Sequence, residues 1–208
     1  MIKIIIVDDH PIFRSGLKQI LETEMEMTVV GTAGSAPELY RILGSITWDL
    51  IILDIHLPGE NGIEILKELL YRDNKVRVLF LSNYPESQYG IRALEAGASG
   101  YMTKETAPRE VVTAIRKIMA GKKYLSETMV EKLANGLGGK SKKTGHETLS
   151  DREFQVMGLL GSGKTVKEVA AELRLSVQTV STYRSRIMAK MKMDSNADMI
   201  RYVIENNL

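Results

Sequence analysis

The sequence predicts two domains of different classes, an α/β domain followed by a small all-α domain. Three observations support this division. The 208 residues exceed the roughly 150 that are typical of one domain. Within residues 1–121, short apolar runs alternate with segments of helical periodicity, whereas residues 148–208 contain helical segments alone. Residues 122–147 include a stretch rich in Gly, Ser and Lys, a composition typical of a flexible linker.

The apolar runs of the first domain are expected to be strands, each followed by a helix. The expected strands are residues 3–7, 28–32, 50–53, 76–81 and 100–102. The expected helices are residues 12–21, 37–43, 62–71, 87–96 and 108–120. Three runs are continuously apolar, as in parallel strands that helices cover on both faces. Five such units with right-handed crossovers favour an α/β flavodoxin-like fold with strand order 2-1-3-4-5.

The second domain is expected to be a bundle of four short helices. They are residues 151–160, 166–173, 177–191 and 196–206. Ser150 and Glu153 have the spacing of a capping box at the start of the first helix. Residues 127–137, ahead of the Gly- and Lys-rich stretch, could form a further short helix.

Composition and charge exclude several classes of protein. The absence of cysteine rules out disulfide scaffolds, thiolate metal sites and thiol nucleophiles. No apolar run approaches the ~20 residues of a membrane span, and the first residues do not resemble a signal peptide, so we expect a cytoplasmic protein. Residues 122–208 hold 15 Lys/Arg and 10 Asp/Glu. This basic half favours an anionic partner, with an ordinary solvated surface as the alternative.

Polar residues directly follow, or closely follow, the carboxyl ends of four of the expected strands. Asp8 and Asp9 follow the first strand, Asp54 the third, Ser82 the fourth and Lys104 the fifth. In the expected strand order three carboxylates meet at one sheet edge, where they repel one another unless a cation neutralises them. Mg²⁺ suits such oxygen ligands. A carboxylate nucleophile, a metal, an ammonium group and a hydroxyl together predict a phosphate-transfer pocket.

The motifs around these residues resemble the receiver domain of two-component response regulators. The resemblance covers residues 1–121. The motifs are Val7-Asp8-Asp9-His10, Leu53-Asp54-Ile55-His56-Leu57-Pro58, Leu81-Ser82 and Gly100-Tyr101-Met102-Thr103-Lys104.

The resemblance implies a role for each acidic residue. Asp54 would be the phosphoacceptor, and Asp9 and Asp54 would bind Mg²⁺ directly. Asp8 would hold a metal-bound water, and the backbone carbonyl of His56 would also ligate the metal.

The resemblance also implies how the site responds. Ser82 and Lys104 would bind the phosphoryl oxygens, and Tyr101 would be the switch aromatic that moves inward with Ser82. Two positions depart from the family's usual pattern. Residue 82 is Ser where Thr is commoner, and Asn83 stands where a smaller residue is usual. We expect Asn83 to crowd the path of an attacking water and so slow the loss of the phosphoryl group.

Residues 158–165 fit the P-loop pattern G-x-x-x-x-G-K-[ST] to the letter. A nucleotide-binding loop must follow a strand and open a helix within a sheet. Here the preceding residues have a helix cap and helical spacing, and only 43 residues follow Thr165. The glycines are therefore better explained as the turn between two helices.

The competing interpretation is a helix-turn-helix. Residues 166–173 and 177–191 would be its two helices, with Ser176 as the N-cap of the second. This second helix would present polar side chains outward, where they can enter a major groove. The outward residues are Gln178, Ser181, Thr182, Ser185 and Arg186. An ordinary polar helix surface is the alternative.

This segment also resembles a known family, the LuxR-type helix-turn-helix, over residues 148–208. The motif residues are Leu149-Ser150, Arg152-Glu153, Gly163-Lys164-Thr165, Lys167-Glu168-Val169-Ala170, Leu173, Leu175-Ser176, Thr179-Val180, Ile187 and Lys190-Met191. With the receiver, it resembles the NarL/FixJ class of transcription regulators.

The second resemblance implies which residues contact DNA. Ser181, Thr182 and Ser185 would read bases. The implied phosphate contacts are Lys164, Thr165, Lys167, Tyr183, Arg184 and Arg186. The family often has His where Tyr183 stands, and some members have Lys where residues 181 and 185 are Ser.

We therefore expect a phosphorylation-dependent DNA-binding transcription regulator rather than an enzyme acting on an outside substrate. A sensor histidine kinase would donate the phosphoryl group, and a homodimer would bind double-stranded promoter DNA. The alternative is a phosphorylation-controlled switch whose helical domain binds a protein partner.

Overall fold

The computed structural model describes residues 1–126, 129–131 and 145–208. The chain divides into two compact units, Met1–Leu137 and Gly138–Leu208. Of the helix expected at residues 127–137, only residues 129–131 are described, and they are helical. The Gly- and Lys-rich stretch of the expected linker lies mostly outside the described residues.

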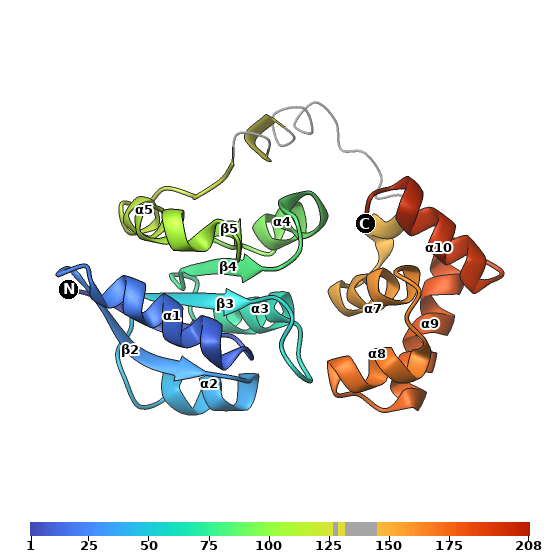
Figure 1. Ribbon diagram of the computed structural model, residues 1–208, viewed down its shortest axis with the longest axis horizontal. Helices are drawn as coiled ribbons and strands as arrows, with labels where there is room; N and C mark the ends of the chain where they lie inside the picture. Colours follow the sequence, from blue (N-terminus) through green and yellow to red (C-terminus); the bar gives the residue numbers. More distant parts are fainter. Residues whose placement is uncertain (127–128, 132–144) are drawn as a thin grey trace. The chain divides into compact units, whose positions relative to one another are not determined.

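The first unit is a five-stranded parallel sheet with helices on both faces (Figure 1). The sheet order is β2-β1-β3-β4-β5, which confirms the predicted topology. The strands are β1 (Ile2–Val7), β2 (Met27–Ala33), β3 (Leu50–Asp54), β4 (Val78–Ser82) and β5 (Gly100–Thr103). The helices are α1 (Pro11–Glu22), α2 (Ala36–Leu43), α3 (Gly62–Arg72), α4 (Glu86–Glu95) and α5 (Ala107–Met119).

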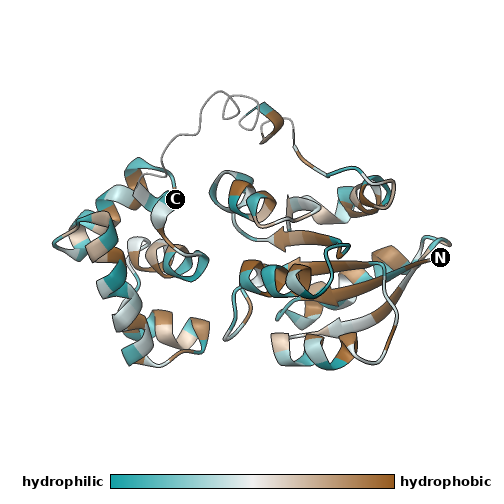
Figure 2. Cartoon of the chain, turned by 180° about the vertical axis from the view of Figure 1, so that it is seen from behind, coloured by the Kyte–Doolittle hydropathy of each residue, from teal (hydrophilic) through white to brown (hydrophobic). Residues whose placement is uncertain are grey.

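Burial follows the apolar pattern of the strands. Every residue of β3 and of β4 is buried, as expected for central strands covered on both faces. Apart from their last residues, Asp54 and Ser82, these strands are hydrophobic, whereas the helices show polar and apolar residues (Figure 2). Helices α1 and α5 pack their apolar residues on the same face of the sheet, including Leu17, Leu21, Val111 and Ile115.

The start of α3 is held close to the end of β3. A Cβ at Gly62 would collide with the backbone oxygen of Asp54, so only glycine allows this approach. Asn61 caps the helix by accepting a hydrogen bond from the Ile63 amide at 2.8 Å. The end of β3, where Asp54 lies, is therefore fixed by the helix that follows it.

The first unit extends beyond residue 121, where the sequence analysis placed the end of the first domain. Residues 122–126 and 129–131 belong to this unit. Tyr124 forms an isolated parallel bridge with Gly100 at the edge of the sheet.

The described residues of the second unit, 145–208, form a 3-10 turn and four helices. They are η1 (Gly145–Thr148), α7 (Asp151–Gly161), α8 (Val166–Leu173), α9 (Val177–Met191) and α10 (Asn196–Glu205). The predicted capping box of Ser150 with Glu153 is confirmed, as is Ser176 as N-cap of α9. The predicted helix boundaries are correct to within one residue.

The P-loop pattern has a structural explanation without a nucleotide. Its first residues are the end of α7, and Gly163 turns the chain with a φ of 92°. Thr165 then caps α8 together with Glu168, and Lys164 pairs with Glu172. These residues join two helices, so the pattern does not mark a phosphate-binding loop.

Within the part of the chain that the structure describes, no helix is long and apolar enough to cross a membrane.

Candidate functional site

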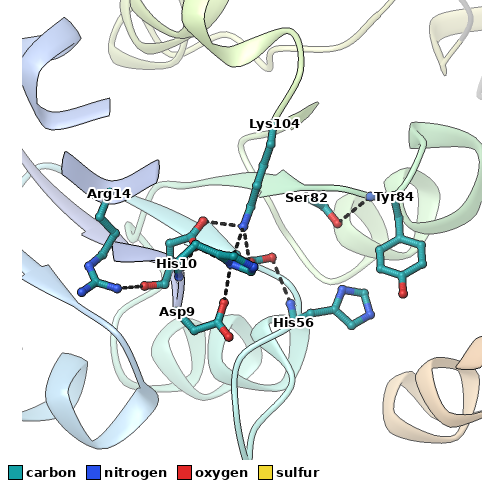
Figure 3. A network of polar contacts seen from close by, with 9 residues as sticks. Asp9, His10, Arg14, His56, Ser82, Tyr84 and Lys104 are labelled. Carbon is teal, nitrogen blue, oxygen red and sulfur yellow. Dashed lines mark hydrogen bonds and ion pairs between the residues drawn. The ribbon is translucent and has the colours of Figure 1, made fainter. Parts of the chain in front are cut away.

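The carboxyl ends of β1, β3 and β5 bring three buried charged groups into contact. Lys104 Nζ donates a hydrogen bond to Asp54 Oδ2 at 2.6 Å and pairs with Asp8 Oδ2 at 2.6 Å (Figure 3). Asp8, Asp54 and Lys104 are all buried. The predicted convergence of these side chains is therefore seen in the structure.

His10 joins this cluster from the first loop. Its Nδ1 lies 2.7 Å from Asp9 Oδ1 and 3.1 Å from Asp8 Oδ1. One potential ligand atom from each of Asp8, Asp9, His10 and Asp54 lies within 4.8 Å of the others. His10 was not predicted to take part in the site, although its position directly after Asp8 and Asp9 was the available signal.

Helix α1 supports the pocket through two further residues that the sequence analysis missed. Arg14 donates a hydrogen bond to the backbone oxygen of Asp8. The ring of Phe13 lies 5.1 Å from Lys104 Nζ, within range of a cation–π contact. Both residues lie in the first turn of α1, close to the pocket.

The charges of the pocket are not balanced. Burial raises the pKa of Asp54 to about 6, with Lys104 opposing the shift and Asp8 adding to it. Burial alone would lower the pKa of Lys104, but Asp54 and Asp8 outweigh it and raise that pKa. One ammonium group is therefore shared by the carboxylates of Asp8 and Asp54, with Asp9 beside them, an arrangement that favours an added cation.

The carboxylate oxygens suit a magnesium ion. Asp8 Oδ2 and Asp9 Oδ1 are buried, and within the described residues their partners are cationic or ionisable nitrogens. Each has an ion-pair contact, with Lys104 and His10 respectively. Oxygen donors of this kind are the ligands Mg²⁺ prefers.

Ser82 and Tyr101 are both bound to Tyr84, in the loop between β4 and α4. Ser82 Oγ accepts a hydrogen bond from the Tyr84 amide at 3.2 Å. Tyr101 is buried, and its hydroxyl donates to the Tyr84 carbonyl at 2.7 Å. Burial also raises the pKa of Tyr101. Ser82 and Tyr101 are therefore connected through one backbone segment.

Three aromatic rings pack beside the end of β3. The ring of His56 lies 4.4 Å from that of Tyr84 and 5.1 Å from that of Tyr89. His56 Nε2 also lies 3.2 Å from the Tyr89 hydroxyl, and its backbone amide donates to Asp54 Oδ1 at 3.1 Å. Asn83 is exposed.

In the second unit, the residues predicted to contact DNA lie on α9, on α8 and in the turn before α8. Six are exposed, namely Thr165, Lys167, Gln178, Thr182, Ser185 and Arg186. Four are half-buried, namely Lys164, Ser181, Tyr183 and Arg184.

Several of these side chains already have partners within the unit. Lys164 pairs with Glu172, and Arg184 Nε donates to Asn196 Oδ1 at 2.7 Å. Thr182 Oγ1 donates to the Gln178 carbonyl at 2.9 Å, and Ser185 Oγ donates to the Ser181 carbonyl at 3.1 Å. The two hydroxyls therefore offer their oxygen lone pairs outward.

Comparison with known families gives two matches that together span most of the chain. Residues 4–116 match the response regulator receiver domain. Residues 147–203 match the bacterial regulatory proteins of the luxR family. The chain belongs to the response regulators. It combines a receiver domain with a LuxR-type DNA-binding domain, as the two resemblances predicted.

Response regulators of known sequence match the chain along its whole length. UvrY of Escherichia coli K12 is 29% identical over 209 residues, covering 100% of this chain and 96% of the relative. The DNA-binding transcriptional activator DevR/DosR of Mycobacterium tuberculosis is 34% identical, covering 99% and 95%. DevR/DosR is by its name a DNA-binding transcriptional activator, the class of function predicted for this response regulator.

Solved structures of response regulators share the fold. RcsB of Salmonella enterica serovar Typhimurium, bound to a promoter, matches with a TM-score of 0.67 at 24% identity, covering 97% of each chain. A LuxR-family response regulator of Aurantimonas sp. SI85-9A1 matches with a TM-score of 0.60 at 36% identity, covering 66% of this chain and 98% of that one.

Proposed function

We propose that this response regulator is controlled by phosphorylation of Asp54, with a sensor histidine kinase as the donor. The observation that carries the proposal is the buried carboxylate of Asp54, 2.6 Å from Lys104 Nζ and beside Asp8 and Asp9. A buried nucleophile next to a cation and further oxygen ligands is what phosphoryl transfer to a carboxylate requires.

The reaction needs Asp54 in its ionised form. A carboxylate oxygen of Asp54 attacks the phosphorus of a phosphohistidine, the P–N bond breaks, and the imidazole leaves with the electron pair and takes up a proton. The product is a mixed anhydride. Lys104 favours the ionised carboxylate before the reaction and can pair with the phosphoryl oxygens after it.

Asp9 and Asp54 are the residues that would hold Mg²⁺ directly, with Asp8 acting through a water and the backbone carbonyl of His56 as a further ligand. When bound, the ion would neutralise charge on the phosphoryl oxygens. The clustering of ligand atoms from Asp8, Asp9 and Asp54 within 4.8 Å of one another supports this assignment.

Phosphorylation would change the bonding of Ser82. The phosphoryl group adds about −1.5 to −2 charges and three acceptor oxygens beside Asp54. Ser82, whose Oγ now accepts from the Tyr84 amide, would instead donate to a phosphoryl oxygen. Because Tyr101 is bound to the Tyr84 carbonyl, the aromatic switch would follow.

The test uses a small phosphodonor. Incubation with acetyl phosphate and Mg²⁺ should raise the mass by about 80 Da, one phosphoryl group. Asp54→Asn or EDTA should abolish the gain, whereas Asp73→Asn, a change at an exposed carboxylate, should not. Labelling that survives Asp54→Asn would contradict the assignment.

We also propose that α9 enters the major groove of promoter DNA and that a homodimer binds paired half-sites. The exposed polar residues of α9 support this placement. RcsB has been solved as dimers bound to DNA and, bound to a promoter, with the phosphomimetic BeF3−.

Selection of bound sites from random duplex DNA, with sedimentation of the protein with and without BeF3−, tests both parts. Enrichment of a two-fold symmetric sequence is expected. Binding to polyanions with no preference for any duplex would instead favour a helical domain that binds a protein partner.

A further inference from the structure

The chain does not leave the first unit where α5 ends. Residues 122–126 and 129–131, here called the strap, lie along β5 and α4. The Tyr124 amide donates to the Ser99 carbonyl at 2.9 Å, and Tyr124 forms a parallel bridge with Gly100. Lys123 Nζ donates to the Ala98 carbonyl at 2.9 Å. The strap thus begins as an addition to the edge of the sheet.

A second anchor joins the strap to α4. The Ser126 hydroxyl is hydrogen-bonded to Glu86, the first residue of α4, and the Ser126 amide lies 3.4 Å from Glu86 Oε1. Met129 is 2% exposed. The Met129 amide donates to Ser126 Oγ at 3.2 Å, which joins the two anchoring residues to each other.

Two glycines of the first unit leave room for the strap. A Cβ at Gly90, in the middle of α4, would overlap the Met129 side chain. A Cβ at Gly100 would lie 2.9 Å from both Cβ and the carbonyl oxygen of Tyr124. Glycine is unfavourable inside a helix, so a packing role accounts for Gly90. The spaces left by the missing side chains at Gly90 and Gly100 are therefore occupied by Met129 and Tyr124 of the strap.

The anchors lie next to the residues that respond to the pocket. Glu86 is two residues beyond Tyr84, whose amide holds Ser82 and whose carbonyl holds Tyr101. Gly100 directly precedes Tyr101 in β5. The loop that carries Tyr84 is therefore close in sequence to the anchor at Glu86, and Tyr101 is next to the anchor at Gly100.

We propose that the surface formed by α4 and β5 binds the strap in the unphosphorylated protein and releases it on phosphorylation. The inference rests on the proposed role of Asp54. When Ser82 turns to the phosphoryl oxygens, its bond from the Tyr84 amide is lost, Glu86 shifts away from Ser126, and Met129 leaves Gly90. The released residues lengthen the tether of the second unit, which then binds DNA more readily.

Gly90→Ala tests the strap without any phosphodonor. The added methyl group occupies the place of Met129 while favouring the helix. We expect the Tyr124 amide to exchange with deuterium at least ten times faster, and the unphosphorylated full chain to bind DNA at least three times more tightly. Gly16→Ala is the matched control, because a Cβ at this helical glycine meets nothing within 4 Å.

Ser126→Ala removes the other anchor and is expected to act in the same direction, with Ser87→Ala as its control on the exposed side of α4. If both Gly90→Ala and Ser126→Ala leave exchange at Tyr124 and DNA affinity unchanged, the strap proposal is wrong.

The link to phosphorylation is tested on the unmodified sequence. With acetyl phosphate and Mg²⁺, exchange at Tyr124 should rise in the fraction that gains phosphoryl mass, while exchange in β3 stays unchanged. A mass gain with unchanged exchange at Tyr124 overturns the strap proposal. An absent mass gain overturns the proposed role of Asp54 instead, and the two variants then decide whether the strap controls DNA binding.

Discussion

The two functional surfaces of this response regulator differ in how the fold holds their side chains. In the first unit, Lys104 is 8% exposed and has two carboxylate partners at 2.6 Å. On α9, Thr182 and Ser185 are exposed and bonded to carbonyls of their own helix. Substitutions in the pocket should therefore alter folding stability and chemistry together. Substitutions on α9 should alter binding alone.

The largest effect is expected for Lys104→Met. It leaves the buried carboxylates of Asp8 and Asp54 without their shared cation, which should lower the free energy of unfolding in metal-free buffer by about 3–5 kcal/mol. Phosphorylation by acetyl phosphate should slow by roughly 100-fold or more. Urea unfolding followed by the fluorescence of Trp48, the single tryptophan, measures the first effect.

Two controls accompany this experiment. Lys18→Met removes an exposed pair with Glu22 and should cost less than about 1 kcal/mol. Adding Asp54→Asn to Lys104→Met should restore much of the stability and none of the phosphorylation. A Lys104→Met protein as stable as the wild type would show that the pocket is no more constrained than the surface of α9.

The second prediction concerns pH. The pKa of Asp54 is raised from 3.8 to about 6 in the folded protein. Between about pH 4 and 6 the folded state therefore binds more protons than the unfolded state. The contribution of Asp54 to stability thus falls as the pH rises through this window and stays constant above it, a change on the order of 3 kcal/mol. The measurement is the difference in unfolding free energy between wild type and Asp54→Asn in metal-free buffer, which should depend on pH in this window.

In the second unit, the contribution of Glu153 to folding stability should change with pH in the opposite direction to that of Asp54. Burial raises the pKa of Glu153, but hydrogen bonds from Lys190 and Ser150 outweigh it and lower that pKa. Its stabilising contribution is present at neutral pH and is lost as the pH falls below the ordinary range of a glutamate. Glu153→Gln should therefore cost most at neutral pH and least in acid. If the difference in unfolding free energy between the wild type and Glu153→Gln instead grew toward low pH, the predicted pH dependence would be wrong.

The contrast also explains what the sequence could and could not predict. Asp8, Asp54 and Lys104 were found because a parallel sheet brings the carboxyl ends of its strands to one edge. His10, Arg14 and the strap were missed, because their contacts depend on the exact course of loops rather than on strand order. Gly90 was the available signal for the strap, as a glycine inside an expected helix.

In the second unit, the spacing of apolar residues and caps predicted the helices. The outward face of α9 followed from the same spacing. The spacing did not predict the partners of Lys164 and Arg184. These side chains are long, and no periodicity specifies the rotamers with which they reach Glu172 and Asn196. Both residues stay predicted phosphate contacts.

The third prediction separates two kinds of contact on the second unit. Lys167→Ala removes a charge near the start of α8 and should weaken binding to specific and random duplexes alike. It should reduce the slope of log K against log salt by about 0.9 if one phosphate contact is lost. Ser185→Ala should instead reduce the preference for the specific site, by about 1–3 kcal/mol if a good base contact is lost, with the salt slope unchanged.

The bonding of the hydroxyls sharpens this prediction. Because Thr182 and Ser185 donate their protons to helix carbonyls, they should accept from base edges, which favours the amino groups of cytosine or adenine. Binding isotherms at several salt concentrations, with base substitutions in the selected site, measure both properties. Equal slope changes in Lys167→Ala and Ser185→Ala would show that Ser185 does not read bases.

The smallest effect concerns the lifetime of the phosphorylated state. It tests whether the residues that follow Ser82, Asn83 and Tyr84, also protect the pocket from water. Asn83 is exposed, whereas the ring of Tyr84 packs against His56 beside Asp54. Asn83→Ala should speed the loss of the phosphoryl group by a factor of about three, on the order of 0.7 kcal/mol in barrier, because a smaller side chain admits water more readily. Tyr84→Ala should have a larger effect, since it also removes the ring from His56. Decay of the mass-labelled protein after removal of acetyl phosphate gives both rates. Unchanged or slower decay in Asn83→Ala, beside faster decay in Tyr84→Ala, would assign the shielding to the aromatic rings instead of to Asn83.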